Sequence, residues 1–119
     1  MWIDRELRQT GRTERMLIAA ADCAANGYQL VIVAADMHHQ AGLQDRFRET
    51  LARRLSASGD DPDTAFRRAW NLVYWITIRE RTQAFREWPR IGKYEPFVFI
   101  DHHAQELIAR DWYTKGGAR

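Results

Sequence analysis

Two segments of the sequence are continuous apolar runs, and each ends in an aspartate that is followed by a pair of histidines. Residues 30–39 read Leu-Val-Ile-Val-Ala-Ala-Asp-Met-His-His, and residues 97–103 read Phe-Val-Phe-Ile-Asp-His-His. Such runs are typical of strands that are buried on both faces of a parallel sheet. Because open α/β sheets bind ligands at the carboxyl ends of their strands, the polar residues that end both runs mark a candidate site. The two segments contain every histidine of the chain: His38, His39, His102 and His103.

The spacing of apolar residues between these runs predicts helices. Between residues 39 and 56, leucine or phenylalanine recurs at every fourth position, which describes one face of an amphipathic helix. Asp61 and Pro62 supply an N-cap and a first-turn proline for a shorter helix. Asn26-Gly27 is a common signal for the end of a helix. The expected helices span residues 13–25, 39–56, a short stretch from Pro62 that carries Phe66, Ala69 and Trp70, and residues 104–113.

Strands are expected at residues 28–35, 72–80 and 97–101, whereas residues 81–88 fit either a helix or a loop. Because helices and strands alternate, we expect one α/β domain over residues 1–119. The expected fold is a small three-layer sandwich, with a mostly parallel sheet of three to four strands flanked by helices. Residues 114–119 are expected to form a flexible C-terminal tail.

Composition narrows the class of protein. The chain has 119 residues and a formal net charge of +2, which does not by itself identify a nucleic-acid binder, although arginines cluster within residues 5–15, 46–54 and 79–90. A single cysteine, Cys23, excludes an internal disulfide and a cysteine-rich zinc module. The amino terminus is charged too early for a signal peptide, and no apolar stretch approaches membrane-spanning length. We therefore expect a cytoplasmic protein without membrane association.

Two short motifs resemble those of P-loop NTPases. Gly11-Arg12-Thr13 resembles the end of a Walker A phosphate loop with arginine in place of lysine, and Phe-Val-Phe-Ile-Asp-His at residues 97–102 resembles a Walker B strand. The order of these motifs is similar to RecA-like and terminase-like ATPase cores, and to small P-loop-like proteins of phages and mobile elements.

This resemblance implies a minimal P-loop-like fold that binds a nucleotide or polyphosphate with magnesium. It implies that Gly11, Arg12 and Thr13 face the phosphates, with Thr13 and Asp101 holding the magnesium ion. His102 occupies the position where such enzymes usually carry a glutamate that polarises water, which implies weak hydrolysis or none.

A second interpretation places a metal site at the rim of the sheet. Asp36, Asp101 and the four histidines 38, 39, 102 and 103 offer a mixed nitrogen and oxygen set that suits zinc, manganese or iron, provided that the two strands are neighbours. The alternative for Asp101 is a structural role as the N-cap of the last helix. Both interpretations remain open from the sequence.

A third interpretation is a non-catalytic binding module, such as a phage-encoded inhibitor of a host or defence complex, or a nucleic-acid binder. Aromatic residues interleave with arginines between residues 67 and 113, and both residue types are enriched at interface hot spots and on single-strand stacking platforms. The aromatic residues are Trp70, Tyr74, Trp75, Trp88, Tyr94, Trp112 and Tyr113. The arginines are Arg67, Arg68, Arg79, Arg81, Arg86 and Arg90.

Overall fold

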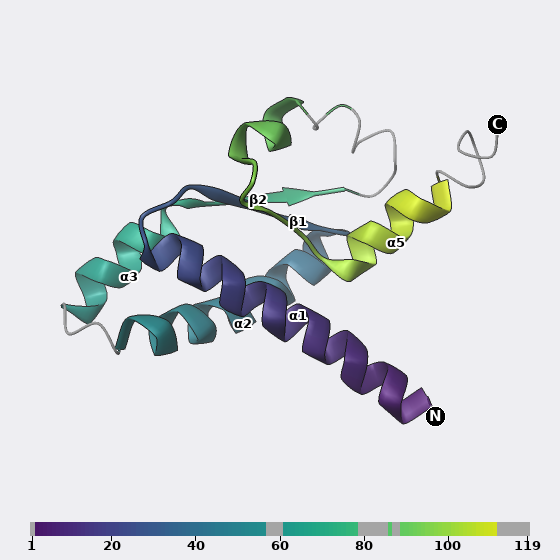
Figure 1. Cartoon of the computed structure of the whole chain (residues 1–119), viewed down its shortest axis with the longest axis horizontal. Helices are drawn as coiled ribbons and strands as arrows, with labels where there is room; N and C mark the ends of the chain where they lie inside the picture. Colours follow the sequence, from purple (N-terminus) through teal and green to yellow (C-terminus); the bar gives the residue numbers. More distant parts are fainter. Residues whose placement is uncertain (1, 57–60, 79–85, 87–88, 112–119) are drawn as a thin grey trace.

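A parallel sheet of three strands forms the centre of the fold (Figure 1). The computed structural model describes residues 2–56, 61–78, 86 and 89–111. Strand β1 (Leu30–Ala34) lies between β2 (Val73–Thr77) and β3 (Val98–Ile100), and both neighbours run parallel to it. In the register of the sheet, Ile32 is opposite Trp75 on one side and Phe99 on the other. The expected α/β fold with a parallel sheet is therefore confirmed.

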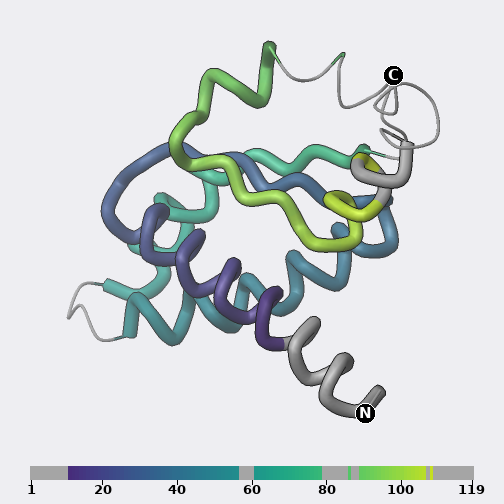
Figure 2. Tube along the Cα trace, turned by 45° about the vertical axis from the view of Figure 1, so that its right-hand side comes forward, coloured from purple at the N-terminus to yellow at the C-terminus, as the bar shows by residue number. Residues whose placement is uncertain are grey.

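Three helices cover one face of the sheet: α1 (Trp2–Ala25), α2 (Met37–Ser56) and α3 (Pro62–Trp70). Figures 1 and 2 show α1 and α2 side by side beneath the strands. The leucine and phenylalanine positions of α2 are buried in the same core as Leu17 of α1 and Ile32 of β1. Their spacing of four residues explains this, because it puts these leucine and phenylalanine side chains on the face of α2 toward the sheet.

The opposite face of the sheet is covered by a second, smaller core. Val31 and Val33 of β1 pack there with Ile91 and Ala104. The covering elements are the 3₁₀ helix η1 (Gly92–Tyr94) and helix α5 (His102–Asp111). Every residue of β1 is consequently buried, and each fully buried aliphatic side chain contributes roughly 1.5–3 kcal/mol to folding. This burial on both faces explains why β1 is apolar without interruption.

Two of the expected helix ends are confirmed in detail. Gly27 has a φ of 88°, and the amides of Gly27 and Tyr28 donate to the carbonyls of Ala24 and Cys23. These two bonds form a Schellman motif, which requires a left-handed residue after the helix. At the start of α3, Asp61 occupies the N-cap position and proline the first turn, as expected, but the Asp61 carboxylate accepts the hydroxyl of Thr64 at 2.6 Å and not a backbone amide.

The first helix is longer than expected, and this changes the context of the Walker-like motif. Helix α1 begins at Trp2 and not at Thr13, so the helix start expected at Gly11-Arg12-Thr13 is wrong. The preceding residues include the good helix formers Arg5, Glu6, Leu7 and Arg8, and a single interior glycine costs only about 1 kcal/mol.

Smaller corrections concern the other boundaries. Helices α2 and α5 begin at Met37 and His102, two residues before the expected starts at 39 and 104. Strand β2 covers 73–77 of the expected 72–80. Of the ambiguous segment 81–88 only residue 86 is described, and the expected tail 114–119 lies outside the described residues. Within the described part of the chain, no helix is long and apolar enough to cross a membrane.

The aromatic side chains proposed for a partner surface have mixed positions. Trp70 and Trp75 pack against Phe47 on the helical side of the sheet, with ring centroids 5.9 and 5.7 Å from that of Phe47. Tyr74 is exposed and lies 5.1 Å from the ring of Tyr94. Several of the other proposed residues, namely Arg79, Arg81, Trp88, Trp112 and Tyr113, lie outside the described residues. The two tryptophans near Phe47 thus contribute to the core.

Candidate functional site

The same local structure occurs where β1 and β3 each lead into a helix. Asp36 is the residue before α2, and its Oδ1 accepts the amide N–H of His39 at 2.8 Å. Asp101 is the residue before α5, and its Oδ2 accepts the amide N–H of His103 at 3.3 Å. Both aspartates therefore cap a helix, which satisfies amides that have no partner within the helix. Capping also fixes both histidine pairs in the first turn of their helices.

Because β1 and β3 are neighbouring parallel strands, the two capped helix starts lie at the same edge of the sheet. The imidazole rings form a row, with centroid separations of 4.0 Å for His102–His103, 4.4 Å for His103–His39 and 5.9 Å for His39–His38. An aspartate lies beside the row at both junctions. Two segments more than sixty residues apart in sequence thus contribute to one cluster of polar groups.

Asp101 and His102 are the buried members of this cluster. Their exposed fractions are 2% and 8%, and Asp101 Oδ1 lies 3.6 Å from His102 Nδ1. The same nitrogen is 3.4 Å from the hydroxyl oxygen of Thr13, which is buried on α1. The other ring nitrogen, Nε2, is buried and has no hydrogen-bond partner among the described residues. A buried polar atom without a partner is costly, so His102 has an unused ligand or hydrogen-bonding position.

The protonation state of His102 favours metal binding. Burial lowers the pKa of its imidazole, and the neighbouring His103 lowers this pKa further, whereas Asp101 and Glu106 act to raise it. A neutral imidazole keeps the lone pair that a metal ion requires.

Three side chains at the start of α5 are arranged so that they can share one ion. Asp101, His102 and His103 each offer a ligand atom, and these atoms lie within 4.8 Å of one another. Consecutive side chains usually diverge on a helix, yet the two imidazoles are 4.0 Å apart with their planes inclined by 38°. Two imidazoles and one carboxylate form a donor set that suits zinc, manganese or iron.

The β1 side of the site is more exposed and differs in its interactions. Nδ1 of His39 lies 2.9 Å from Asp36 Oδ1, and both side chains are about one-third exposed or more. The hydrogen bonds from His39 lower the pKa of Asp36, so this carboxyl is ionised at neutral pH. His38 is exposed and lies at the end of the row of rings. Asp36 thus orients His39 toward the row, as carboxylates commonly orient metal-binding histidines.

Two cavities open beside these groups. One, of about 220 Å³, is lined by His38, His39 and His103 together with Gly42, Leu43 and Arg46. The other, of about 380 Å³, lies between α1 and β3 and reaches His102. Thr13 and Asp101 line both cavities. The candidate ligands are therefore accessible from two sides, although Asp101 and His102 themselves are buried.

The structural role of the Walker-like motif differs from the one that the resemblance implies. Gly11, Arg12 and Thr13 lie inside α1, where backbone amides donate to carbonyls four residues earlier and do not form a phosphate loop. Thr13 contacts His102, and the exposed Arg12 lines the cavity beside β3. The structure thus brings Arg12 and Thr13 close to Asp101 and His102, but through side chains from the middle of a helix.

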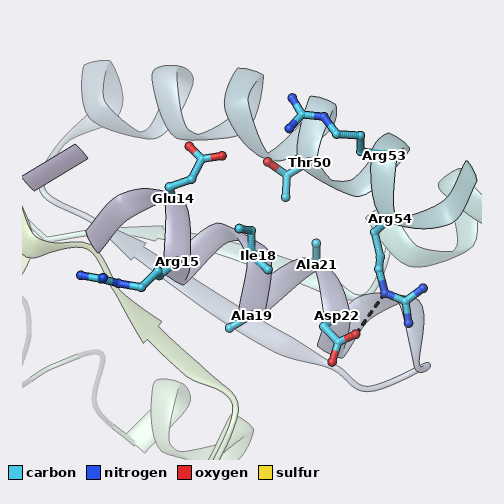
Figure 3. A pocket seen from close by; sticks show the side chains of 9 residues that line it. All are labelled: Glu14, Arg15, Ile18, Ala19, Ala21, Asp22, Thr50, Arg53 and Arg54. Carbon is cyan, nitrogen blue, oxygen red and sulfur yellow. Dashed lines mark hydrogen bonds and ion pairs between the residues drawn. The ribbon is translucent and has the colours of Figure 1, made fainter. Parts of the chain in front are cut away.

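A third cavity, larger than these two, lies away from this cluster, in the groove between α1 and α2 (Figure 3). It has a volume of about 540 Å³ and is lined by Ile18, Ala19 and Ala21, with charged residues at its margins. One of these, Arg54, bonds Asp22 across the groove at 3.0 Å. A second ion pair, in which Arg46 Nη2 lies 2.8 Å from Glu14 Oε2, links the same two helices. Half-exposed pairs of this kind contribute about 0–1 kcal/mol each.

Sequence reasoning missed Arg15 and Gln105, which line the cavity between α1 and β3 together with Arg12. A spacing of three residues between Arg12 and Arg15 was visible in the sequence, but it gained meaning only once both residues were known to be helical.

The chain matches no protein-family model, and it has no significant similarity to a curated protein or to a solved structure.

Proposed function

We propose that the protein binds a divalent transition-metal ion at the carboxyl edge of its sheet, through Asp101, His102 and His103. The observation that carries this proposal is the convergence of one carboxylate and two imidazoles, whose ligand atoms lie within 4.8 Å of one another. Nδ1 of His102 lies 3.6 Å from Asp101 Oδ1, and its Nε2 is buried without a hydrogen-bond partner among the described residues. Zinc suits this donor set best, since three protein ligands leave a fourth position for water or another ligand.

His39 and Asp36 support the site from the β1 side. The ring of His39 lies 4.4 Å from that of His103, and Asp36 holds His39 in place. In this arrangement His39 limits the rotation of His103 and supplies a further imidazole near the ion. An ion with an open coordination position is the arrangement that lowers the pKa of bound water in metal-dependent hydrolases. Hydrolytic chemistry is therefore the reaction class to test first once the metal is bound.

The test is a zinc titration of the purified, metal-free protein by calorimetry, with His102→Ala and His38→Ala as a matched pair. His102→Ala removes the proposed buried ligand, whereas His38→Ala removes the exposed imidazole at the end of the row. We expect one zinc ion per chain. The loss of affinity in His102→Ala should exceed the roughly 10- to 100-fold loss that follows removal of an outer partner of a ligand.

The His38→Ala variant should bind zinc within a few-fold of the parent protein, because His38 is not one of the three converging residues. Equal affinity in the parent and in His102→Ala would contradict the proposal. Equal losses in both variants would show that zinc binds unspecifically to exposed imidazoles. Circular dichroism of each variant checks that the helices are retained.

Nucleotide binding and the binding-module role remain predictions from the sequence. Both agree with the arginines on the surface, but the helical conformation of residues 11–13 takes away the loop on which nucleotide binding was based. Calorimetry with Mg-ATP on the parent protein and on Arg12→Ala tests the nucleotide prediction directly. A micromolar affinity that is lost in the variant would support it.

A further inference from the structure

The cavity between α1 and β3 combines three kinds of wall. Two guanidinium groups, those of Arg12 and Arg15, come from α1, and the edge strand β3 supplies an apolar side. Asp101 and His102, two of the proposed metal ligands, form the end of the cavity at the edge of the sheet. With about 380 Å³, its volume is within the range of small-molecule pockets, roughly 300–1,000 Å³.

Positive charge on this wall is not neutralised by the described part of the protein. Arg12 and Arg15 are one helical turn apart, so they lie on neighbouring parts of the same face of α1. Neither has an ion-pair partner among the described residues, whereas Arg46, Arg48 and Arg54 each pair with a carboxylate. Arg15 also borders the groove between α1 and α2, and Figure 3 shows its side chain extending away from Arg53 and Arg54.

The charge of Arg12 acts on the proposed site. Its guanidinium lines the same cavity as Asp101 and His102, the two proposed ligands at the end of the cavity. An anion in this cavity would meet positive charge from Arg12 and Arg15. A metal ion on Asp101 and His102 would add positive charge to the same end of the cavity, and the local charges of a metal site usually determine which ligands enter it.

We propose that this cavity binds a phosphoryl group, as found in a phosphate monoester, between Arg12, Arg15 and the metal ion of the proposed function, on which the inference rests. Guanidinium forks match the oxygens of a phosphoryl group two at a time, and a dianion balances two arginines better than a single carboxylate does. The apolar wall of Phe99 and Met16 accommodates the organic part of the ester.

The experiment uses phenyl phosphate as the probe and benzoate as its carboxylate counterpart, each titrated into zinc-loaded protein that has been freed of excess metal. The test variant is Arg12→Gln combined with Arg15→Gln, and the control is Arg53→Gln, an exposed arginine that lines the groove between α1 and α2 but not this cavity. Exposed arginines are replaced in both variants, so the fold should be retained. We expect the double variant to bind phenyl phosphate at least about 10-fold more weakly, since each lost charge-assisted contact to phosphate is worth over 1 kcal/mol.

Zinc affinity, measured separately on the same samples, distinguishes the two proposals. If zinc binds the parent and the double variant equally, and phenyl phosphate binding needs both the arginines and the metal, the inference is supported. Unchanged phenyl phosphate binding in the double variant, or equal affinity for benzoate, would overturn the phosphoryl assignment while the metal site stands. If the parent protein binds no zinc, the proposed function fails and the metal-assisted phosphoryl site fails with it.

Discussion

At the scale of single residues, Asp101 combines two roles that the sequence left as alternatives. Its carboxylate caps α5 by accepting the amide N–H of His103, and its other oxygen faces His102. The aspartate is only 2% exposed, so its oxygens need partners, and in our proposal one of these partners is an ion. Asp36 has the same capping geometry but is more exposed, which shows that the cap alone does not require burial.

Substitution separates the two roles of Asp101. Asn is as good an N-cap as Asp, whereas Ala is not, and the loss of a cap costs about 0.5–2 kcal/mol. We expect Asp101→Asn to retain more of the free energy of unfolding than Asp101→Ala, and both variants to lose zinc affinity because neither carries a carboxylate. Urea denaturation and zinc titration of both variants measure these effects. Zinc affinity near that of the parent in Asp101→Asn would remove Asp101 from the ligand set.

At the scale of helices and strands, the sequence predicted those elements that local signals determine, such as apolar runs and capping residues. The apolar runs identified β1 and β3, and the capping residues identified the start of α3 and the end of α1. The predicted start of α1 was wrong, because a Gly-Arg-Thr triplet resembles both a phosphate loop and a helix cap. In the structure, the residues before the triplet belong to the same helix. Which strand lies in the centre depends on contacts between distant segments, and no local pattern contains this information.

Helix ends give a prediction at this scale. Gly27 has a φ of 88°, and a Cβ added there meets no atom within 4 Å, so the cost of Gly27→Ala is a backbone cost alone. A left-handed conformation costs a non-glycine residue roughly 1–2 kcal/mol, and the free energy of unfolding should fall by that amount. Urea denaturation measures this loss.

Gly42→Ala is the matched control for Gly27→Ala. Gly42 lies inside α2 and likewise has open space around an added Cβ, but its φ is not positive. Alanine is preferred to glycine in a helix by roughly 0.5–1 kcal/mol, so this variant should be more stable than the parent. If Gly42→Ala also lowered the free energy of unfolding, the added side chain, and not the backbone conformation, would explain the effects at Gly27 and Gly42.

At the scale of the whole molecule, the site depends on how two packed layers bring distant residues together. The sequence predicted that the histidines meet only if the two strands are neighbours, and the pairing of β1 with β3 fulfils this condition. Arg12 and Arg15 join the site only because α1 packs beside β3, which no spacing in the sequence reveals. The candidate metal ligands could thus be named from the sequence, whereas the position of Arg12 and Arg15 beside them could not.

Phe47 tests the core that holds these layers. It is fully buried and contacts Trp70 of α3 and Trp75 of β2, so it links three elements. Phe47→Ala should lower the free energy of unfolding by about 3–5 kcal/mol, through lost burial and a residual cavity. The control Met37→Ala, at a position that is 60% exposed, should change it by no more than about 0.5 kcal/mol. Similar effects in both variants, measured in urea, would contradict this description of the core.

Among the described residues, strand β3 pairs with one strand, β1, and contributes three residues to the sheet. Asp101, His102 and His103 all follow it directly, whereas His39 follows the central strand. Local opening of β3 would therefore carry three candidate ligands away together while the helical layer stays folded. An ion held by these residues and contacted by His39 would join β3 to β1 at this edge of the sheet. Binding of the ion and pairing of β3 with β1 would then be a single equilibrium.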